Sequence, residues 1–287
     1  MKKVLKFLLI TIVYTVLYMI SNALLPFSAA FKAASAGSDG SLLIFFVLSA
    51  TYTCFVICFI TANLAKRSLK SSLWVFFMVF VTQSVMTQIE TLFFGGAFGL
   101  LTTADTLFIM LTPLLPTLAA CFMARRFFGR GEPAPGGTLP NVPRNRMLAR
   151  LALVGVIYLA IYFVFGYFVA WQSPDLRLFY SGTAGDPGFL GQLAVNYENN
   201  PVIFPFQILR GMMFGLCVWP LRFLLGNRKG RFTLSVCLVY MLTAVVLIVP
   251  NVLFPDSVRL AHLVEMSTSM LLFGVVSGRL LRLPEGR

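Results

Sequence analysis

Four ionisable residues lie inside long apolar runs of the sequence: Glu90, Arg210, His262 and Glu265. An ionisable side chain in the hydrocarbon layer of a membrane costs ~2.5–3.5 kcal/mol on insertion scales, and such residues commonly mark substrate or proton pathways. A buried Glu–Arg group can exchange with a substrate anion or a proton, and a Glu beside a His can act as a general base. We therefore expect all four residues to bind substrate, and we consider Glu90, Glu265 and His262 as candidate catalytic residues.

Four uncharged polar residues lie at helical spacing from these groups: Gln83, Thr87, Gln207 and Ser269. The first two form an i, i+4, i+7 series that ends at Glu90, and the others lie three or four residues from Arg210 or Glu265. Residues at these spacings share one face of a helix. The polar residues thus form three stripes, one ending at Glu90, one at Arg210 and one that runs from His262 to Ser269. Because a polar stripe facing lipid is unfavourable, we expect the three stripes to face one another. They would form a substrate-binding cleft open to the outer side, with Arg210 between Glu90 and Glu265.

Five neighbouring residues receive simpler interpretations. Pro205 lacks a backbone N–H, so we expect it to leave a carbonyl one turn earlier without its helical hydrogen-bond donor. Arg259 is expected to extend its guanidinium towards the outer headgroups. We interpret Tyr158 and Tyr162 as packing residues and Tyr180 as part of the outer aromatic belt.

The elements that position these residues follow from composition. The chain has 287 residues, of which 58% are hydrophobic and only 11% charged, against roughly 25% charged in soluble domains. Runs near ~20 apolar residues are long enough to cross a membrane. We therefore predict an all-α, polytopic transmembrane bundle in a single integral membrane domain, 1–287. Its eight spans are expected at about 5–25, 42–65, 72–94, 102–123, 148–171, 202–225, 232–250 and 258–281.

The basic residues predict an orientation. Most of the 23 Lys and Arg residues lie on alternate connections between the spans, and the other connections carry mainly Asp and Glu. Cytoplasmic loops of membrane proteins are enriched in Lys and Arg, so both termini are expected in the cytoplasm and the protein in the plasma membrane. The net charge of +13 therefore predicts affinity for anionic inner-leaflet lipids and no nucleic-acid partner.

The connections and the first span carry further predictions. The segment 129–145 contains four Pro and four Gly and is expected to be a flexible cytoplasmic linker. A short interfacial helix is expected near 176–180, and Pro113 and Pro116 should kink the fourth span. The first apolar run could be a cleaved secretory signal, but Phe7–Leu25 exceeds the usual ~7–15 residues of a signal core. We expect a retained helix.

These residues are consistent with three functions. We favour transport or binding of a small polar molecule, ion or lipid at the polar cleft. The first alternative is a hydrolase or transferase at the outer leaflet with a Glu general base, and the second is an accessory protein in which a buried ion pair is purely structural. No cofactor is expected. A metal site built from Glu90, His262 and Glu265 is disfavoured because Arg210 would repel a cation, and the five cysteines are interpreted as packing residues.

Overall fold

The computed structural model describes residues 2–35, 41–65, 68–95, 99–129, 142–225 and 229–282. Within these ranges the chain is helical, with short π-helical and 3-10 turns between some helices. The helices are α1 (Lys2–Leu24), α2 (Ala29–Ser35), α3 (Ser41–Ala62), α4 (Leu69–Phe80), α5 (Met86–Phe93), α6 (Thr103–Leu111), α7 (Leu114–Phe128), α8 (Arg144–Phe168), α9 (Pro174–Ser181), α10 (Gly188–Asn199), α11 (Ile203–Val218), α12 (Leu221–Leu224), α13 (Lys229–Tyr240), α14 (Leu242–Val245) and α15 (Asp256–Arg282).

In the described part of the chain, eight helical segments are long and apolar enough to cross a membrane, which confirms the predicted all-α fold. They are α1, α3, α4 with α5, α6 with α7, α8, α11 with α12, α13 with α14, and α15. Large apolar side chains remain exposed along these segments, for example Leu5 (70%), Ile44 (65%) and Leu209 (55%). Side chains of this kind are suited to contact with lipid tails.

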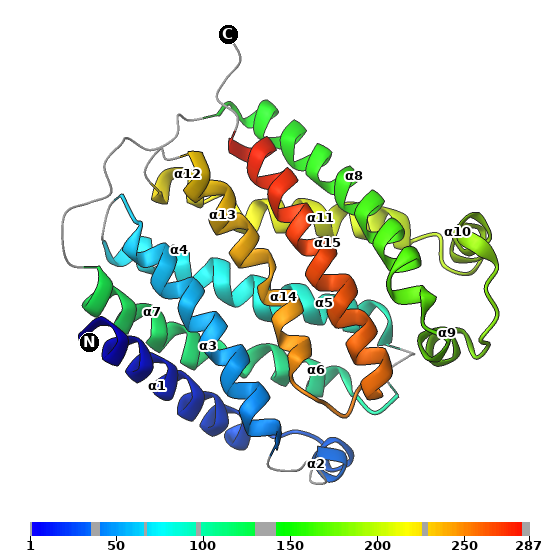
Figure 1. The fold of residues 1–287 in the computed structure, drawn as a ribbon, viewed down its shortest axis with the longest axis horizontal. Coiled ribbons are helices and arrows are strands. Elements are labelled where there is room, and N and C mark those ends of the chain that lie inside the picture. The colour runs from blue at the N-terminus through cyan, green and yellow to red at the C-terminus, as the bar shows by residue number, and fades with distance from the viewer. Residues whose placement is uncertain are drawn as a thin grey trace.

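The spans form two groups of four (Figure 1). In the first group α1 packs against α3 and α7, and α4 packs against α7. In the second group α8 packs against α11 and α15, and α15 packs against α13. The long connection between α7 and α8 joins the groups, and most of this predicted linker, 129–145, lies outside the described residues.

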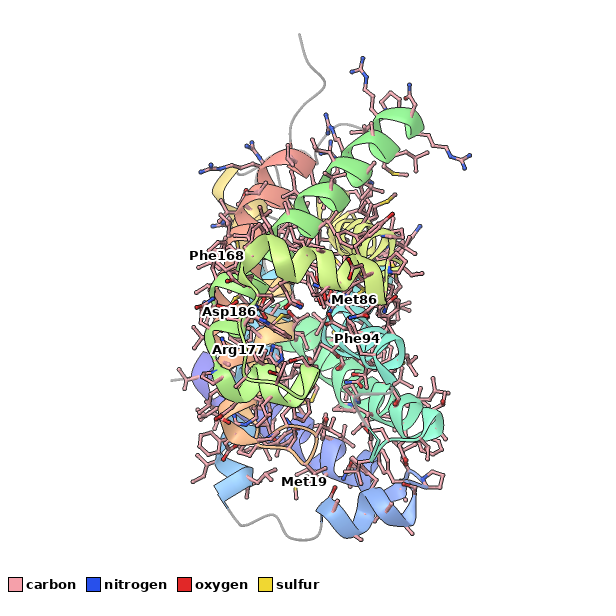
Figure 2. All side chains as sticks on the ribbon, turned by 90° about the vertical axis from the view of Figure 1, so that its right-hand side faces the viewer. Met19, Met86, Phe94, Phe168, Arg177 and Asp186 are labelled. Atoms are coloured by element: carbon pink, nitrogen blue, oxygen red, sulfur yellow. The ribbon has the colours of Figure 1, made fainter. Side chains whose placement is uncertain are left out.

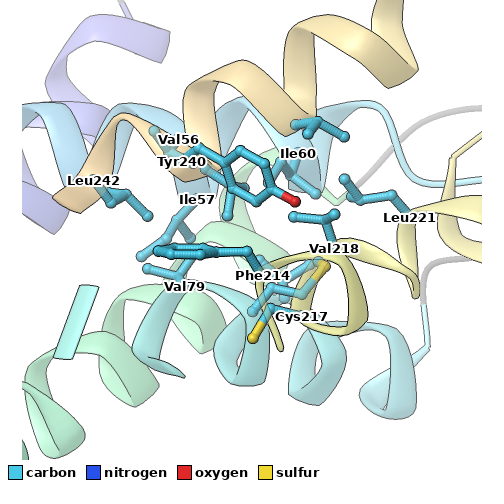
Figure 3. Packing of buried hydrophobic residues seen from close by; sticks show 14 of the residues in the cluster. Val56, Ile57, Ile60, Val79, Phe214, Cys217, Val218, Leu221, Tyr240 and Leu242 are labelled. Atoms are coloured by element: carbon cyan, nitrogen blue, oxygen red, sulfur yellow. The ribbon is translucent and has the colours of Figure 1, made fainter. Parts of the chain in front are cut away.

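The main apolar core lies where the two groups meet. Figure 3 shows Ile57 of α3 and Val79 of α4 beside Phe214 of α11, Tyr240 of α13 and Leu242 of α14. Each of these side chains is at most 1% exposed. The core therefore contains residues of both groups, and interior packing holds the groups together.

Prolines in two spans have different effects. The helix of the fourth span is interrupted at Pro113, between α6 and α7, as predicted, whereas Pro116 lies in the first turn of α7. Pro205 also lies in a first turn, because α11 begins at Ile203. N–H groups in a first turn have no intrahelical partner, so Pro205 removes no bond. The prediction that it frees a carbonyl was wrong, since the Pro201 carbonyl accepts from the Phe204 N–H at 3.4 Å.

The third span contains a π-helical turn, Val81–Val85, between α4 and α5. The Met86 N–H bonds to the Val81 carbonyl five residues earlier. A π turn holds an extra residue, and such turns occur frequently at functional sites. Since each α-helical residue accounts for about 100° of rotation, one extra residue turns α5 to a different face from the one expected for a continuous α-helix.

The two ends of the bundle differ. The starts of α1 and α8 and the end of α15 lie along one edge in Figure 1, and α2, α9 and α10 lie towards the opposite edge. The helix expected near 176–180 is α9, while α2 and α10 were not predicted. Both α9 and α10 are viewed nearly along their axes while α8 lies in the plane (Figure 1), so they run across the ends of the spans.

Candidate functional site

Arg210, the eighth residue of α11, is 1% exposed and is held by groups from α5. Its Nη2 lies 2.7 Å from Oε2 of Glu90. Nε and Nη2 both donate to the Met86 carbonyl, at 3.3 and 3.1 Å. The structure thus brings the guanidinium and one of the predicted carboxylates into a direct ion pair. Met86 and Phe94 mark the two ends of α5 in Figure 2.

Gln207 connects both members of this pair. Arg210 Nη1 donates to Gln207 Oε1 at 3.4 Å, and Gln207 Nε2 donates to Glu90 Oε1 at 3.4 Å. The guanidinium carbon also lies 5.7 Å from the ring centroids of Tyr158 and of Phe214, within the range of cation–π attraction. We call Glu90, Gln207 and Arg210 the arginine cluster. It joins the two groups of spans, since α5 belongs to the first and α11 to the second.

Close packing of α8 on α11 places Arg210 beside Tyr158. A Cβ added to Gly211 would lie 2.4 Å from the Cβ of Tyr158 and 2.9 Å from the Cα of Gly155. Gly215, one turn further on, would meet Leu151 at 2.8 Å. Small residues four apart let helix backbones approach closely in membranes. This Gly-x-x-x-Gly spacing was not considered in the sequence interpretation, although it was visible there.

A second cluster lies at the start of α15. Ser269 Oγ donates to Glu265 Oε1 at 3.3 Å, and Glu265 Oε2 lies 3.7 Å from His262 Nδ1. His262 Nε2 in turn lies 3.0 Å from the hydroxyl of Tyr180 on α9. We call Tyr180, His262, Glu265 and Ser269 the histidine cluster. Tyr180 was expected in an aromatic belt, and the structure adds that its hydroxyl lies against the single histidine of the chain.

Both clusters lie near α8. The side chains of Tyr158 and Tyr162 on α8 lie close to the charged groups of Glu90, Arg210 and Glu265. Sequence reasoning treated these tyrosines as packing residues. In the described part of the chain the ion pair of Arg210 is with Glu90, whereas the partners of Glu265 are those of the histidine cluster. We had expected Arg210 to lie between Glu90 and Glu265; among the described residues it forms an ion pair with Glu90 and none with Glu265.

Gln83 lies apart from the arginine cluster, and Thr87 forms no hydrogen bond with that cluster in the described part of the chain. Gln83 Nε2 donates to the Tyr14 hydroxyl at 2.9 Å, and its Oε1 accepts from Thr53 at 3.2 Å. Thr87 Oγ1 donates to carbonyls of its own helix, those of Gln83 and Ser84. The π turn accounts for this separation, because it gives Gln83 and Glu90 different faces of the third span. Gln83 instead connects that span to α1 and α3.

The expected open cleft is closed in this structure. Gln207 and Arg210 are at most 1% exposed and Glu265 is 7% exposed, so the polar groups pack against one another. The side chains of Glu90 and His262 retain exposed fractions of 26% and 22%. A surface hollow of about 60 Å³ lies beside α5 and α6, and no candidate residue lines it.

Arg259 provides a contrast with Arg210. Its guanidinium donates to Asp256 at 2.8 Å and to the carbonyls of Leu247 and Ile248 at 2.8 and 3.2 Å. Arg259 is 6% exposed, so the prediction that it extends towards headgroups was wrong. It binds the carbonyls of the 3-10 turn that follows α14, which is a local structural role.

The described residues show no cluster of side chains suited to a metal ion. Among them, no three His, Cys, Asp or Glu side chains gather as a metal site would require. Cys54, Cys58, Cys121, Cys217 and Cys237 are all buried and unbridged.

Known proteins give no identification. No protein-family model, curated protein or solved structure matches this chain. Its function is therefore inferred from the arrangement of its own residues.

Proposed function

We propose that this multi-pass membrane protein binds a small polar substrate bearing a carboxylate or phosphate, either free or as a lipid headgroup, and transports it across the membrane. The observation that carries the proposal is the position of Arg210. It is buried within a spanning helix and paired with Glu90 across the boundary between the two groups of spans. Transporter sites commonly lie at such boundaries, among charged groups that pair with one another.

Substrate binding would proceed by exchange. The contacts of Gln207 with both Arg210 and Glu90 are 3.4 Å long, which is weak for hydrogen bonds. Glu90 is 26% exposed at its side chain, so it can become hydrated or protonated when it leaves Arg210. An incoming carboxylate or phosphate oxygen would then accept the Nη2 proton, because guanidinium binds both groups well.

Ligand binding can be tested without knowing the substrate. Purified protein in detergent would be heated with phosphate, sulfate, short mono- and dicarboxylates, or short-chain phosphatidic acid. We expect at least one anion to raise the unfolding temperature of wild type and of Arg259→Gln, and to have no effect on Arg210→Gln. Equal stabilisation of Arg210→Gln, or no stabilisation by any of these anions, would contradict the proposal. The lipid arm distinguishes a headgroup from a free anion.

Transport itself requires a sealed compartment. A stabilising anion in radiolabelled form should enter proteoliposomes that contain wild type, and Glu265→Gln should abolish that flux or its pH dependence while leaving the protein folded. Glu198→Gln is the matched control, because Glu198 lies exposed on α10. Unchanged pH-dependent flux in Glu265→Gln would remove Glu265 from the transport site.

A second candidate is supported by the histidine cluster. A Tyr–His–Glu series resembles the arrangements used in general acid–base catalysis, so an outer-leaflet hydrolase or transferase remains the alternative. Such an enzyme would form product in detergent, where no gradient exists, and would require both Glu90 and Glu265. Transport predicts no product in detergent.

The proposed location is the plasma membrane with both termini inside, and the basic cytoplasmic face would contact anionic inner-leaflet lipids. The distribution of basic residues supports this orientation. All five native cysteines are buried, so an introduced cysteine can be labelled selectively. An impermeant maleimide should label Thr183→Cys on intact cells and Arg146→Cys only after permeabilisation. The reverse pattern would invert the topology.

A further inference from the structure

The histidine cluster forms a continuous series of polar contacts from α9 into α15. The Tyr180 hydroxyl and His262 Nε2 are 3.0 Å apart, His262 Nδ1 and Glu265 Oε2 are 3.7 Å apart, and Ser269 Oγ donates to the other carboxylate oxygen. Burial increases along the series, since the side chain of His262 is 22% exposed and that of Glu265 is 9% exposed. The series therefore leads from the bundle surface to a buried acid.

Glu265 has no permanent counter-charge among the described residues. In the described ranges no Lys or Arg forms an ion pair with it, because Arg210 pairs with Glu90 and Arg259 with Asp256. A buried carboxylate without a cation is strongly penalised unless it is protonated or has a protonated neighbour. Among the described residues in contact with Glu265, His262 is the side chain that can supply that positive charge near neutral pH.

The surroundings add few competing groups. Three tyrosines lie close to Glu265, namely Tyr158 and Tyr162 from α8 and Tyr180 from α9, and all three also lie close to Glu90 of α5. Arg210 of α11 lies close to Tyr158 and Tyr162. Arg177 on α9 donates instead to the Trp171 and Ala184 carbonyls. From α13, Cys237 contacts α15 at Leu271, further along the helix. The segment 242–248, which also packs against α15, has no titratable residue.

Tyr180 is held in place by α9. Ser173 caps this helix by accepting from the Leu176 N–H, and Gly182 ends it in a left-handed conformation with φ of 70°. Leu176 packs against Val258 of α15 in a small core of its own. Burial, and then the charges of Glu90 and Glu265, raise the pKa of the Tyr180 hydroxyl. Tyr180 therefore remains a neutral phenol that can both donate and accept a hydrogen bond.

The contacts define how one proton would be held. With His262 neutral, Nδ1–H points to the Glu265 carboxylate and Nε2 accepts from the Tyr180 hydroxyl. When a proton is added at Nε2, the ring becomes an imidazolium beside the carboxylate, and Nε2–H then donates to the Tyr180 oxygen. Tyr180 changes from donor to acceptor and loses no proton of its own. The charge of the pair rises by one, from −1 to zero.

We propose that His262 and Glu265 form a proton-binding site, with Tyr180 as the contact that connects its protonation to α9. The proton would be held jointly by the two residues. This inference rests on contacts separate from those of Arg210. Its failure would leave the proposed anion site standing, and failure of anion binding would leave the proton site standing.

The single histidine allows a direct test. Protein labelled with ¹⁵N-histidine in nanodiscs gives ring nitrogen signals from His262 alone. We expect the neutral ring to carry its proton on Nδ1, and the midpoint of the wild-type titration to differ from that of Glu265→Gln. Glu198→Gln should titrate like wild type. Equal midpoints in wild type and Glu265→Gln, or a proton on Nε2 in the neutral ring, would overturn the proposal.

A second variant avoids any change inside the membrane. In Tyr180→Phe the Nε2 signal of His262 should move towards that of a ring without a hydrogen-bond partner at that nitrogen. Amide hydrogen exchange in α9 should depend on the protonation of His262 in wild type and become independent of it in Tyr180→Phe. Tyr197→Phe is the matched control, because Tyr197 is 65% exposed on α10. If the His262 signals and the exchange of α9 are the same in Tyr180→Phe and wild type, Tyr180 does not connect the site to α9.

Discussion

Replacing Glu90 by Gln should destabilise the protein more than replacing Arg210 by Met, although Glu→Gln is the smaller chemical change. In Glu90→Gln the guanidinium stays 1% exposed and keeps only neutral acceptors, the Met86 carbonyl and Gln207. In Arg210→Met the remaining carboxylate is 26% exposed, so it can hydrate or take up a proton. The residue left behind therefore determines the cost.

The magnitudes follow from this asymmetry. Removing one partner of a buried ion pair costs ~3–5 kcal/mol, and we expect ~3 kcal/mol for Glu90→Gln because Glu90 is partly exposed. Arg210→Met should cost ~2 kcal/mol, as for a lost hydrogen bond to a charged group. The double variant has neither charge and should also lose only ~2 kcal/mol. It would then be more stable than Glu90→Gln alone.

Equilibrium unfolding by SDS in mixed micelles at neutral pH would give the four free energies of unfolding. Asp256→Asn is the control, because Asp256 is 75% exposed in its pair with Arg259, and exposed pairs contribute ~0–1 kcal/mol. The reasoning is refuted if the double variant loses the sum of the two single losses, or if Arg210→Met is the more damaging single change.

Three other perturbations test separate features. Gly211→Val should cost more than ~2 kcal/mol because a Cβ there would come within 2.4 Å of α8. Gly166→Ala should be neutral or slightly stabilising, since a Cβ there meets nothing within 4 Å. Equal losses in the two variants would contradict the close approach of α8 and α11. Deleting Val85 should remove the π turn and with it the coupling energy between Glu90 and Arg210. That energy is measured by comparing the Glu90→Gln, Arg210→Met and double variants, and an unchanged value would show that the π turn does not position the ion pair. Hydrogen bonds from a backbone N–H and a tyrosine hydroxyl lower the pKa of Asp186. These hydrogen bonds order the connection between α9 and α10. We expect that order to be present above the ordinary pKa of an aspartate and to be lost as the pH falls through the lowered pKa of Asp186. Hydrogen exchange corrected for intrinsic rates would show this, and the same pH dependence in Asp186→Asn would argue against it.

The spans could be predicted because the bilayer imposes one requirement on all of them. Each must present ~20 apolar residues, and the predicted 72–94 and 202–225 correspond to Leu69–Phe93 and Ile203–Leu224. The short helices α2 and α10 were missed because neither is constrained by the bilayer thickness. The polar first turn of α8 was also not predicted, because it adds nothing to the apolar run. This helix begins at Arg144 rather than near residue 148.

The candidate site was predictable within a helix but less so between helices. Helical spacing correctly grouped Gln207 with Arg210, and His262 with Glu265 and Ser269. It misassigned Gln83, because the pattern of polar residues contains no sign of the π turn. The tyrosines of α8 and α9 were missed for a related reason. Their role depends on which helices are neighbours, and helix packing cannot be read from the periodicity of one segment.

The arginine cluster also explains how movement and substrate binding would be linked in the proposed transport cycle. If the two groups of spans separate, Arg210 on α11 must leave Glu90 and the Met86 carbonyl, both of which belong to the other group. A buried guanidinium left with only the neutral Gln207 amide oxygen of its own helix is too costly to be populated. Separation is therefore favourable only when another anion accompanies Arg210, and a substrate carboxylate or phosphate would meet that requirement. An empty carrier would remain closed, as the packed arrangement around Arg210 is in this structure.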